Sequence, residues 1–165
     1  MLMLPRIAFV VLLVLVAAMI AGTSGALPEP IATHFGMGGV ANGFMSRDGY
    51  LLFMLAFTIV IPLLVVAMTG LLPGIARSPR NIQHYDYWFA PARRAESSAR
   101  LLSHACLLGC LMVLFFGGMH VVLMVANAAT PPRLPETAFF IILGAFLVGI
   151  ALWIFFMRRM FARAD

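Results

Sequence analysis

The chain has 165 residues, of which 63% are hydrophobic and only 10% are charged, and its mean hydropathy is +1.03. A soluble domain cannot hide this much apolar surface, so the composition excludes most soluble classes and indicates an integral membrane protein. All eleven basic residues are arginine, and their excess over six acidic residues gives a net charge of +5. In so apolar a chain this charge favours lipid phosphates over nucleic acid as the partner.

Four apolar stretches are each long enough to cross the roughly 30 Å core of a bilayer as a helix. They cover residues 7–26, 50–72, 101–126 and 137–157, and none contains Asp, Glu or Arg. The expected fold class is therefore an all-α integral membrane protein, with one domain of four transmembrane helices.

The arginines predict the orientation of these spans, because basic residues in short loops stay on the cytoplasmic side. Nine lie on one side: Arg6, Arg77, Arg80, Arg93, Arg94, Arg100, Arg158, Arg159 and Arg163. The other side has Arg47 and Arg133. Both termini are therefore expected in the cytoplasm, with an outer loop over residues 27–49 and a basic inner loop over residues 73–100.

The first span could also be a signal peptide, since Arg6, the apolar run and Ser24-Gly25-Ala26 imitate that pattern. We expect it to be retained, because the N-termini of membrane proteins often show this imitation. Small residues four apart predict helix-packing seams. The candidate pairs are Ala17/Ala21, Ala18/Gly22 and Ala145/Gly149.

The outer loop is polar and rich in glycine. Residues 36–39 (Gly-Met-Gly-Gly) permit tight turning, and Asn42-Gly43 is typical of a turn. The candidate recognition residues are His34, Phe35, Asn42, Gly43, Arg47 and Asp48. In one interpretation His34 senses a proton or a ligand, because an imidazole changes its protonation near physiological pH. In the other, His34 only hydrogen-bonds to the backbone of a structured loop.

The inner loop mixes arginines with aromatic residues, a combination typical of a membrane-surface anchor on anionic headgroups. A docking site for a cytoplasmic partner is the alternative. Its candidate residues are Asn81, Asp86, Tyr87, Trp88, Arg93, Arg94 and Glu96. Pro91 suits the first turn of a helix leading into span three, and Glu96 is placed to pair with Arg100. Asn81 or Asp86 could cap a short helix here.

One face of span three carries Cys106, Cys110 and His120. Thiolate and imidazole suit copper(I) or haem, but the other spans offer no second histidine and no acid. We therefore expect a packing face, with His120 hydrogen-bonded to a neighbouring helix or to the outer interface, and no metal or cofactor. The chain also lacks a nucleophile, base and orienting group in a catalytic pattern, so an enzyme is not expected.

Two segments suggest a family. The run Leu27-Pro28, Ile31, His34-Phe35, Gly39, Asn42-Gly43-Phe44, Ser46-Arg47 resembles the loop of a bacterial membrane domain of unknown function that also occurs in the sporulation-delaying-protein immunity family. Residues 81–96 resemble a second segment of such proteins, through Asn81, Asp86-Tyr87-Trp88, Pro91, Arg93-Arg94 and Glu96. This chain departs from the family pattern at three positions: it has Ala32, Arg47 and Gln83 where members of the family usually have proline, lysine and proline.

The resemblance implies a multi-pass protein of the bacterial inner membrane, of the immunity or signalling type. We expect the outer loop to recognise an extracytoplasmic ligand and the inner loop to contact lipid or a cytoplasmic regulator. One alternative is a small accessory subunit that binds another membrane protein, because polar groups are scarce within the spans. A metal- or haem-binding membrane protein using His34, His120 and the cysteines is the second alternative.

Overall fold

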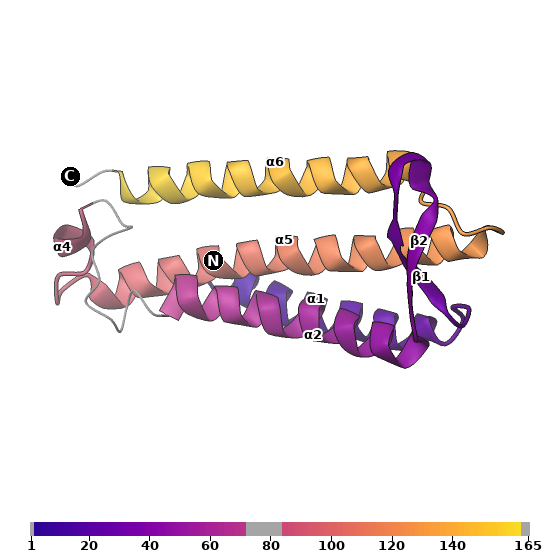
Figure 1. The fold of residues 1–165 in the computed structure, drawn as a ribbon. Coiled ribbons are helices and arrows are strands. Elements are labelled where there is room, and N and C mark those ends of the chain that lie inside the picture. The colour runs from indigo at the N-terminus through magenta and orange to yellow at the C-terminus, as the bar shows by residue number, and fades with distance from the viewer. Residues whose placement is uncertain (1, 72–83, 163–165) are drawn as a thin grey trace.

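The computed structural model describes residues 2–71 and 84–162 and is mostly helical (Figure 1). Its elements are α1 (Met3–Ser24), β1 (Ile31–Phe35), the 3-10 helix η1 (Met37–Gly39), β2 (Ala41–Met45), α2 (Arg47–Val66), the π-helical turn η2 (Ala67–Leu71), α4 (Tyr85–Trp88), α5 (Arg94–Ala128) and α6 (Glu136–Phe161). The expectation of a helical protein is confirmed, with a β-hairpin added between the first two long helices.

Four helices are long and apolar enough to cross a membrane. They are Met3–Ser24, Arg47–Leu71, Arg94–Ala128 and Glu136–Phe161, and each contains most of one predicted span. All four begin before the apolar stretch does, because each helix includes polar residues near its start. In α2, for example, Ser46 is the N-cap and its hydroxyl accepts a hydrogen bond from the amide of Gly49 at 3.2 Å.

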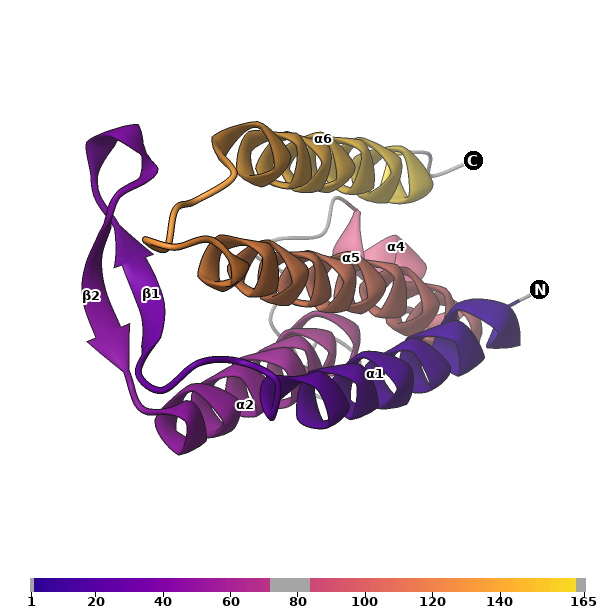
Figure 2. The ribbon, with the colours of Figure 1, turned by 90° about the vertical axis from the view of Figure 1, so that its right-hand side faces the viewer.

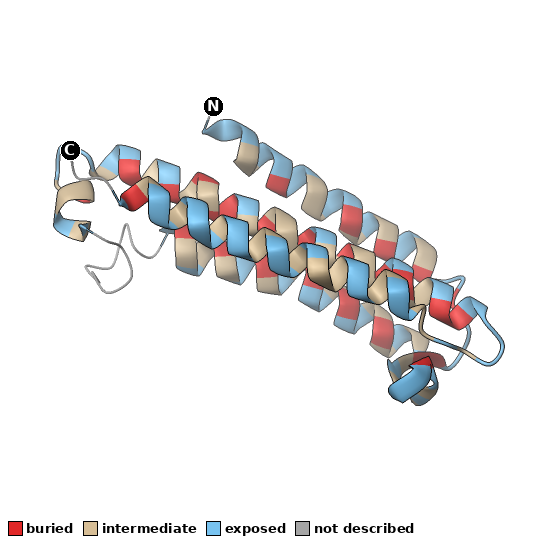
Figure 3. Ribbon diagram, turned by 90° about the horizontal axis from the view of Figure 1, so that it is seen from above, coloured by how far each residue is buried: buried red, intermediate tan, exposed pale blue. Residues whose placement is uncertain are grey.

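α5 is the central helix of the bundle (Figures 1 and 2). α1 and α2 pack against one side of it and against each other, whereas α6 packs against the opposite side. Within α6 only Phe161 is buried, and the helix is exposed or half-buried along the rest of its length (Figure 3). Apolar side chains therefore cover much of the outer surface of α6, as expected of a helix that faces lipid.

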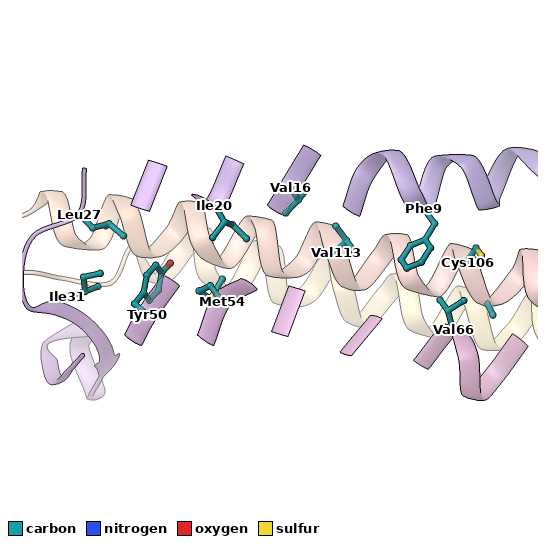
Figure 4. Packing of buried hydrophobic residues seen from close by; sticks show 11 residues of the cluster. Phe9, Val16, Ile20, Leu27, Ile31, Tyr50, Met54, Val66, Cys106 and Val113 are labelled. Carbon is teal, nitrogen blue, oxygen red and sulfur yellow. The ribbon is translucent and has the colours of Figure 1, made fainter. Parts of the chain in front are cut away.

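The main core lies between α1, α2 and α5 (Figure 4). Two glycines of α5 let α1 approach closely: a Cβ built on Gly109 would lie 2.6 Å from Cε2 of Phe9, and one on Gly117 would lie 2.9 Å from Cγ1 of Val16. The seams predicted on α1 are wrong for this bundle. Ala18 and Ala21 are exposed, and a Cβ on Gly22 would meet nothing within 4 Å.

Residues 31–45 form an antiparallel hairpin that lies across one end of the helices (Figures 1 and 2). We call this the hairpin end, and the opposite end, which carries α4, the α4 end. The turn falls at the glycine-rich residues 36–39, as predicted, and Gly38 and Gly39 have positive φ angles of 76° and 73°. The prediction of a turn at Asn42-Gly43 is wrong, because both residues lie inside β2.

Candidate functional site

A buried histidine links three helices near the hairpin end. His120 of α5 is fully buried, and its Nδ1 lies 2.7 Å from the hydroxyl of Tyr50 in α2. Its Nε2 lies 2.7 Å from Oγ1 of Thr23 in α1. The Thr23 hydroxyl already donates to the carbonyl of Met19 at 2.7 Å, so it accepts from Nε2–H, and Nδ1 accepts from the hydroxyl of Tyr50. His120 is therefore a neutral, fully bonded connector.

A second polar side chain fixes the hairpin to the bundle. Asn127, in the last turn of α5, accepts a hydrogen bond from the amide of Ala32 at 2.8 Å and donates to the carbonyl of Ala32 at 2.9 Å. Its amide nitrogen also donates to the carbonyl of Leu123. Asn127 thus pairs with β1 as a neighbouring strand would. Proteins that residues 27–47 resemble usually have proline at the position of Ala32. A proline has no N–H, so it could not donate the hydrogen bond that Ala32 gives to Asn127.

The two ends of the hairpin are joined by Arg47. Its guanidinium donates to the carbonyl of Leu27 from Nη2 at 2.7 Å and from Nε at 3.1 Å. Its backbone amide donates to Oε2 of Glu29 at 2.8 Å, so this carboxylate sits at the positive N-terminus of α2. Arg47 was a predicted recognition residue, but its side chain is engaged in holding the hairpin together.

The turn of the hairpin docks on the loop between α5 and α6. The amide of Leu134 donates to the carbonyl of Gly39 at 2.9 Å, and Val40 forms an isolated β-bridge with Arg133. A Cβ on Gly39 would lie 3.0 Å from the carbonyl oxygen of Leu134, so a side chain there would press against this contact. The hairpin is therefore anchored at its base, at its middle and at its turn.

The other predicted recognition residues do not converge on one pocket. His34, Asn42 and Asp48 are exposed, and Asp48 lies apart from the strands in the first turn of α2. His34 pairs with Gly43 across the hairpin, and its Nδ1 lies 3.2 Å from Oγ1 of Thr33. A Cβ on Gly43 would lie 2.9 Å from Cβ of His34, so the glycine makes room for the histidine.

The outer edge of β2 is open. Because both peptide groups of Ala32 bond to Asn127, the pair Ala32 and Phe44 belongs to the non-hydrogen-bonded type in the antiparallel ladder. The amide and carbonyl of Phe44 consequently point away from β1. Within residues 2–71 and 84–162 no third strand lies beside β2, and no turn or loop hydrogen bond reaches either group. Half-buried Phe35 lies on the other strand, whereas the Phe44 side chain is 56% exposed.

At the α4 end, the inner-loop aromatic residues pack mainly on protein. Nε1 of Trp88 donates to the carbonyl of Phe161 at 3.2 Å, and Phe89 is buried beside Phe161. The guanidinium of Arg93 lies 3.9 Å above the ring of Tyr87. The anchor prediction is thus incomplete, because Trp88 and Phe89 join the short helix α4 to the end of α6.

The remaining inner-loop predictions have mixed outcomes. Glu96 pairs with Arg100 at 2.6 Å, as predicted. α5 begins at Arg94 rather than near residue 91, and the N-cap of α4 is His84, so Asp86 lies inside its first turn and does not occupy the cap. Asn81 lies outside the described residues.

The weak metal candidates lie on one face of α5, as predicted, but do not form one site. Both ring nitrogens of His120 are taken by hydroxyl groups. Cys106 and Cys110 are free thiols more than two turns away along the helix. Nor do the described residues include a group of three or more His, Cys, Asp or Glu side chains arranged to hold a metal ion.

Sequence reasoning overlooked Thr23, Tyr50 and Asn127. Each is a polar group near the end of an apolar stretch, where hydropathy treats it as a boundary. One signal could have found two of them: Thr23, Tyr50 and His120 each lie near the outer end of a predicted span. Residues at a similar depth in the membrane can contact one another, so this comparison would have indicated Thr23 and Tyr50 as partners of His120.

Comparison with known proteins finds a family model that matches part of the chain. Residues 9–60 match the family model described as "Domain of unknown function (DUF1648)". This segment includes most of α1, the whole hairpin and the first part of α2. No curated protein and no solved structure matches the chain. The match agrees with the expected resemblance to a domain of unknown function, and it does not reach residues 81–96.

Proposed function

We propose that the protein is a non-enzymatic, multi-pass protein of the bacterial cytoplasmic membrane that recognises an extended peptide outside the cell through its hairpin. Both termini then lie in the cytoplasm. The α4 end presents lipid-facing or partner-facing groups, among them Arg93, Arg94 and Glu96.

The distribution of arginines supports this orientation. The α4 end carries Arg6, Arg93, Arg94, Arg100, Arg158 and Arg159 among the described residues. At the hairpin end lie Arg47 and Arg133, and Arg47 is already bonded to the protein backbone. Basic residues are retained on the cytoplasmic side during insertion, so the hairpin end should face outward.

The observation that carries peptide recognition is the open edge of β2. An extended peptide can add to such an edge as a third strand, using the outward-pointing amide and carbonyl of Phe44. The exposed Phe44 ring supplies apolar contact next to these groups, and His34 and Asn42 are exposed on the same hairpin. Asn127 and Arg47 hold the hairpin in place, which lowers the ordering cost of binding.

Site-specific photo-crosslinking tests the proposal. Benzoylphenylalanine replaces Phe44 in one variant and Phe155, an exposed residue of α6, in the control. After irradiation of native membranes, we expect peptide or protein adducts at position 44 and only lipid adducts at position 155. These adducts should decrease when Asn127→Ala loosens the hairpin. Lipid adducts alone at both positions would overturn peptide recognition in favour of a hairpin that rests on the membrane.

The immunity form of the proposal rests on the resemblance of residues 27–47 and is tested genetically. Cells lacking the gene should become more sensitive to peptide toxins of the sporulation-delaying class, and the parent gene should restore resistance. Unchanged sensitivity would contradict the immunity role, while the crosslinking result would still decide peptide recognition.

A second candidate, an accessory subunit of a larger membrane complex, is favoured by the exposed apolar surface of α6. Mild-detergent purification separates the two functions. A subunit should co-purify with stoichiometric protein partners, whereas an independent receptor should emerge alone.

A further inference from the structure

The interface between α5 and α6 contains an apolar groove. Two cavities of about 330 Å³ and 200 Å³ lie along it, and they share Leu111 and Leu114 of α5. The first cavity extends toward the α4 end as far as His104 and Phe156. The second extends toward the hairpin end as far as Gly118. The groove follows α5 from His104 to Gly118, which is a rise of about 21 Å.

Arginines stand at the α4 end of this groove. On α6, Leu152 and Phe156 line the groove. Arg159 follows Phe156 by three residues and Leu152 by seven, so it lies on the same face of the helix. On α5, Arg100 precedes the lining residue His104 by one turn. Arg100 is paired with Glu96, so its charge is partly offset, whereas Arg159 is exposed. The groove therefore passes from an apolar interior to a cationic mouth.

A fixed polar pair lies between the apolar part and this mouth. The rings of His104 and Trp153 are stacked with centroids 5.0 Å apart. Nε2 of His104 donates to the carbonyl of Trp153 at 3.1 Å, and Nε1 of Trp153 donates to the carbonyl of His104 at 2.8 Å. These reciprocal bonds hold α5 and α6 together at this level of the groove.

We propose that this groove binds one acyl chain of an anionic phospholipid, with the lipid phosphate at Arg159. A groove of about 21 Å accommodates a chain that spans one leaflet, which is about half of the roughly 30 Å bilayer core. Arginine suits the phosphate because its guanidinium forms charge-assisted hydrogen bonds with phosphate oxygens. The inference rests on the membrane placement in the proposed function, and it is independent of peptide recognition.

Arg159→Gln tests the headgroup contact, and Arg158→Gln is its matched control. Arg158 is also exposed in the last turn of α6, but it lies on a different face from the groove residues. Native mass spectrometry of delipidated protein, titrated with phosphatidylglycerol or phosphatidylethanolamine, measures the affinity of the first bound lipid. Arg159→Gln should weaken phosphatidylglycerol binding about fivefold, the equivalent of about 1 kcal/mol for one basic residue at a membrane surface. Arg158→Gln should leave the affinity nearly unchanged.

Leu114→Trp tests the acyl-chain contact, because Leu114 lines both cavities and is 55% exposed, so the larger ring can be accommodated without disturbing the core. We expect it to reduce binding of both lipids, while Val148→Trp, at a position 60% exposed and outside the two cavities, should not.

Three outcomes would overturn the proposal. Equal losses in the Arg158 and Arg159 variants would indicate unspecific charge attraction. Equal affinity of the parent for both lipids would exclude an anionic headgroup site. If the parent protein forms a dimer that Leu114→Trp abolishes, the groove is a dimer interface and not a lipid site. Crosslinking at Phe44 is unaffected by each of these results, so failure of this proposal is distinguishable from failure of peptide recognition.

Discussion

At the scale of single residues, His120 joins α1, α2 and α5 through Thr23 and Tyr50. Replacing it with leucine leaves the Tyr50 hydroxyl without its acceptor in a buried site. An unsatisfied buried donor costs about 1–3 kcal/mol, so we expect His120→Leu to lower the free energy of unfolding by this amount. Thermal unfolding of the purified protein in detergent measures the change.

Tyr50→Phe completes a double-mutant cycle with this substitution. It removes the hydroxyl and leaves only Nδ1 of His120 without a donor, so its effect should be smaller than that of His120→Leu. The double variant should lose less stability than the sum of the losses in the two single variants. The reason is that the Tyr50 hydroxyl, which His120→Leu leaves without an acceptor, is absent from the double variant. Strict additivity would show that the Tyr50–His120 bond does not contribute to stability.

Asn127 offers a second prediction at this scale, because it holds both peptide groups of Ala32. Asn127→Ala should speed amide hydrogen exchange in residues 31–45 at least severalfold, while α1 and α5 keep most of their protection. Asn42→Ala is the control, since Asn42 is exposed on the same hairpin. Unchanged exchange in the Asn127 variant would mean that the contacts of Arg47 at the base of the hairpin and of Gly39 at its turn are sufficient to hold it.

The sequence allowed part of this residue-level picture to be predicted. A histidine inside an apolar span must find a hydrogen-bond partner, and His120 does so on neighbouring helices, as predicted. Its partners were not predictable, because they depend on how α1 and α2 are rotated about their axes. Arg47 looked free for a ligand for a similar reason: its partner, the carbonyl of Leu27, is a backbone group that no pattern of side chains indicates.

At the scale of elements, helix packing depends on glycines of α5. Gly109→Ala would place a Cβ 2.6 Å from Cε2 of Phe9 and 2.8 Å from Cγ2 of Val66. Overpacking of this kind costs about 1–3 kcal/mol, and we expect thermal unfolding to show that loss. Gly22→Ala is the matched control, because its Cβ would meet nothing within 4 Å. If both variants unfold at the parent temperature, the close approach of α1 to α5 is not required.

The seam predictions failed for α1 because spacing alone does not identify the helix that faces a small residue. On α6 the predicted pair Ala145/Gly149 does face α5, since a Cβ on Gly149 would lie 3.0 Å from Cδ2 of Leu111. Residues 18 and 22 of α1 have the right spacing but lie on its exposed face, whereas the close contacts come from Gly109 and Gly117 of α5. The hairpin shows the same limit. Asn42-Gly43 has the composition of a turn, but Gly43 is needed opposite His34, and the turn falls at Gly38 and Gly39, where φ is positive.

At the scale of the whole molecule, the four long helices were predictable because span length and apolar composition are properties of contiguous sequence. The separation of α6 from α1 and α2 was not, since each span is apolar on nearly every face. Orientation belongs to this scale as well, and it follows from the sum of the arginines at each end. We therefore expect the hairpin end to be extracytoplasmic in every copy of the protein.

Cysteine labelling of intact cells checks this orientation. Met37 is fully exposed at the turn of the hairpin, and Ala162 is exposed just after α6. Met37→Cys should react with a membrane-impermeant maleimide in intact cells, whereas Ala162→Cys should react only after permeabilisation. The parent protein is the control for Cys106 and Cys110, which lie within α5. Labelling of Ala162→Cys in intact cells would contradict the proposed orientation and, with it, the placement of the hairpin outside. Because the orientation depends on the sum of the arginines at each end, replacing Arg133 alone should leave the labelling pattern unchanged.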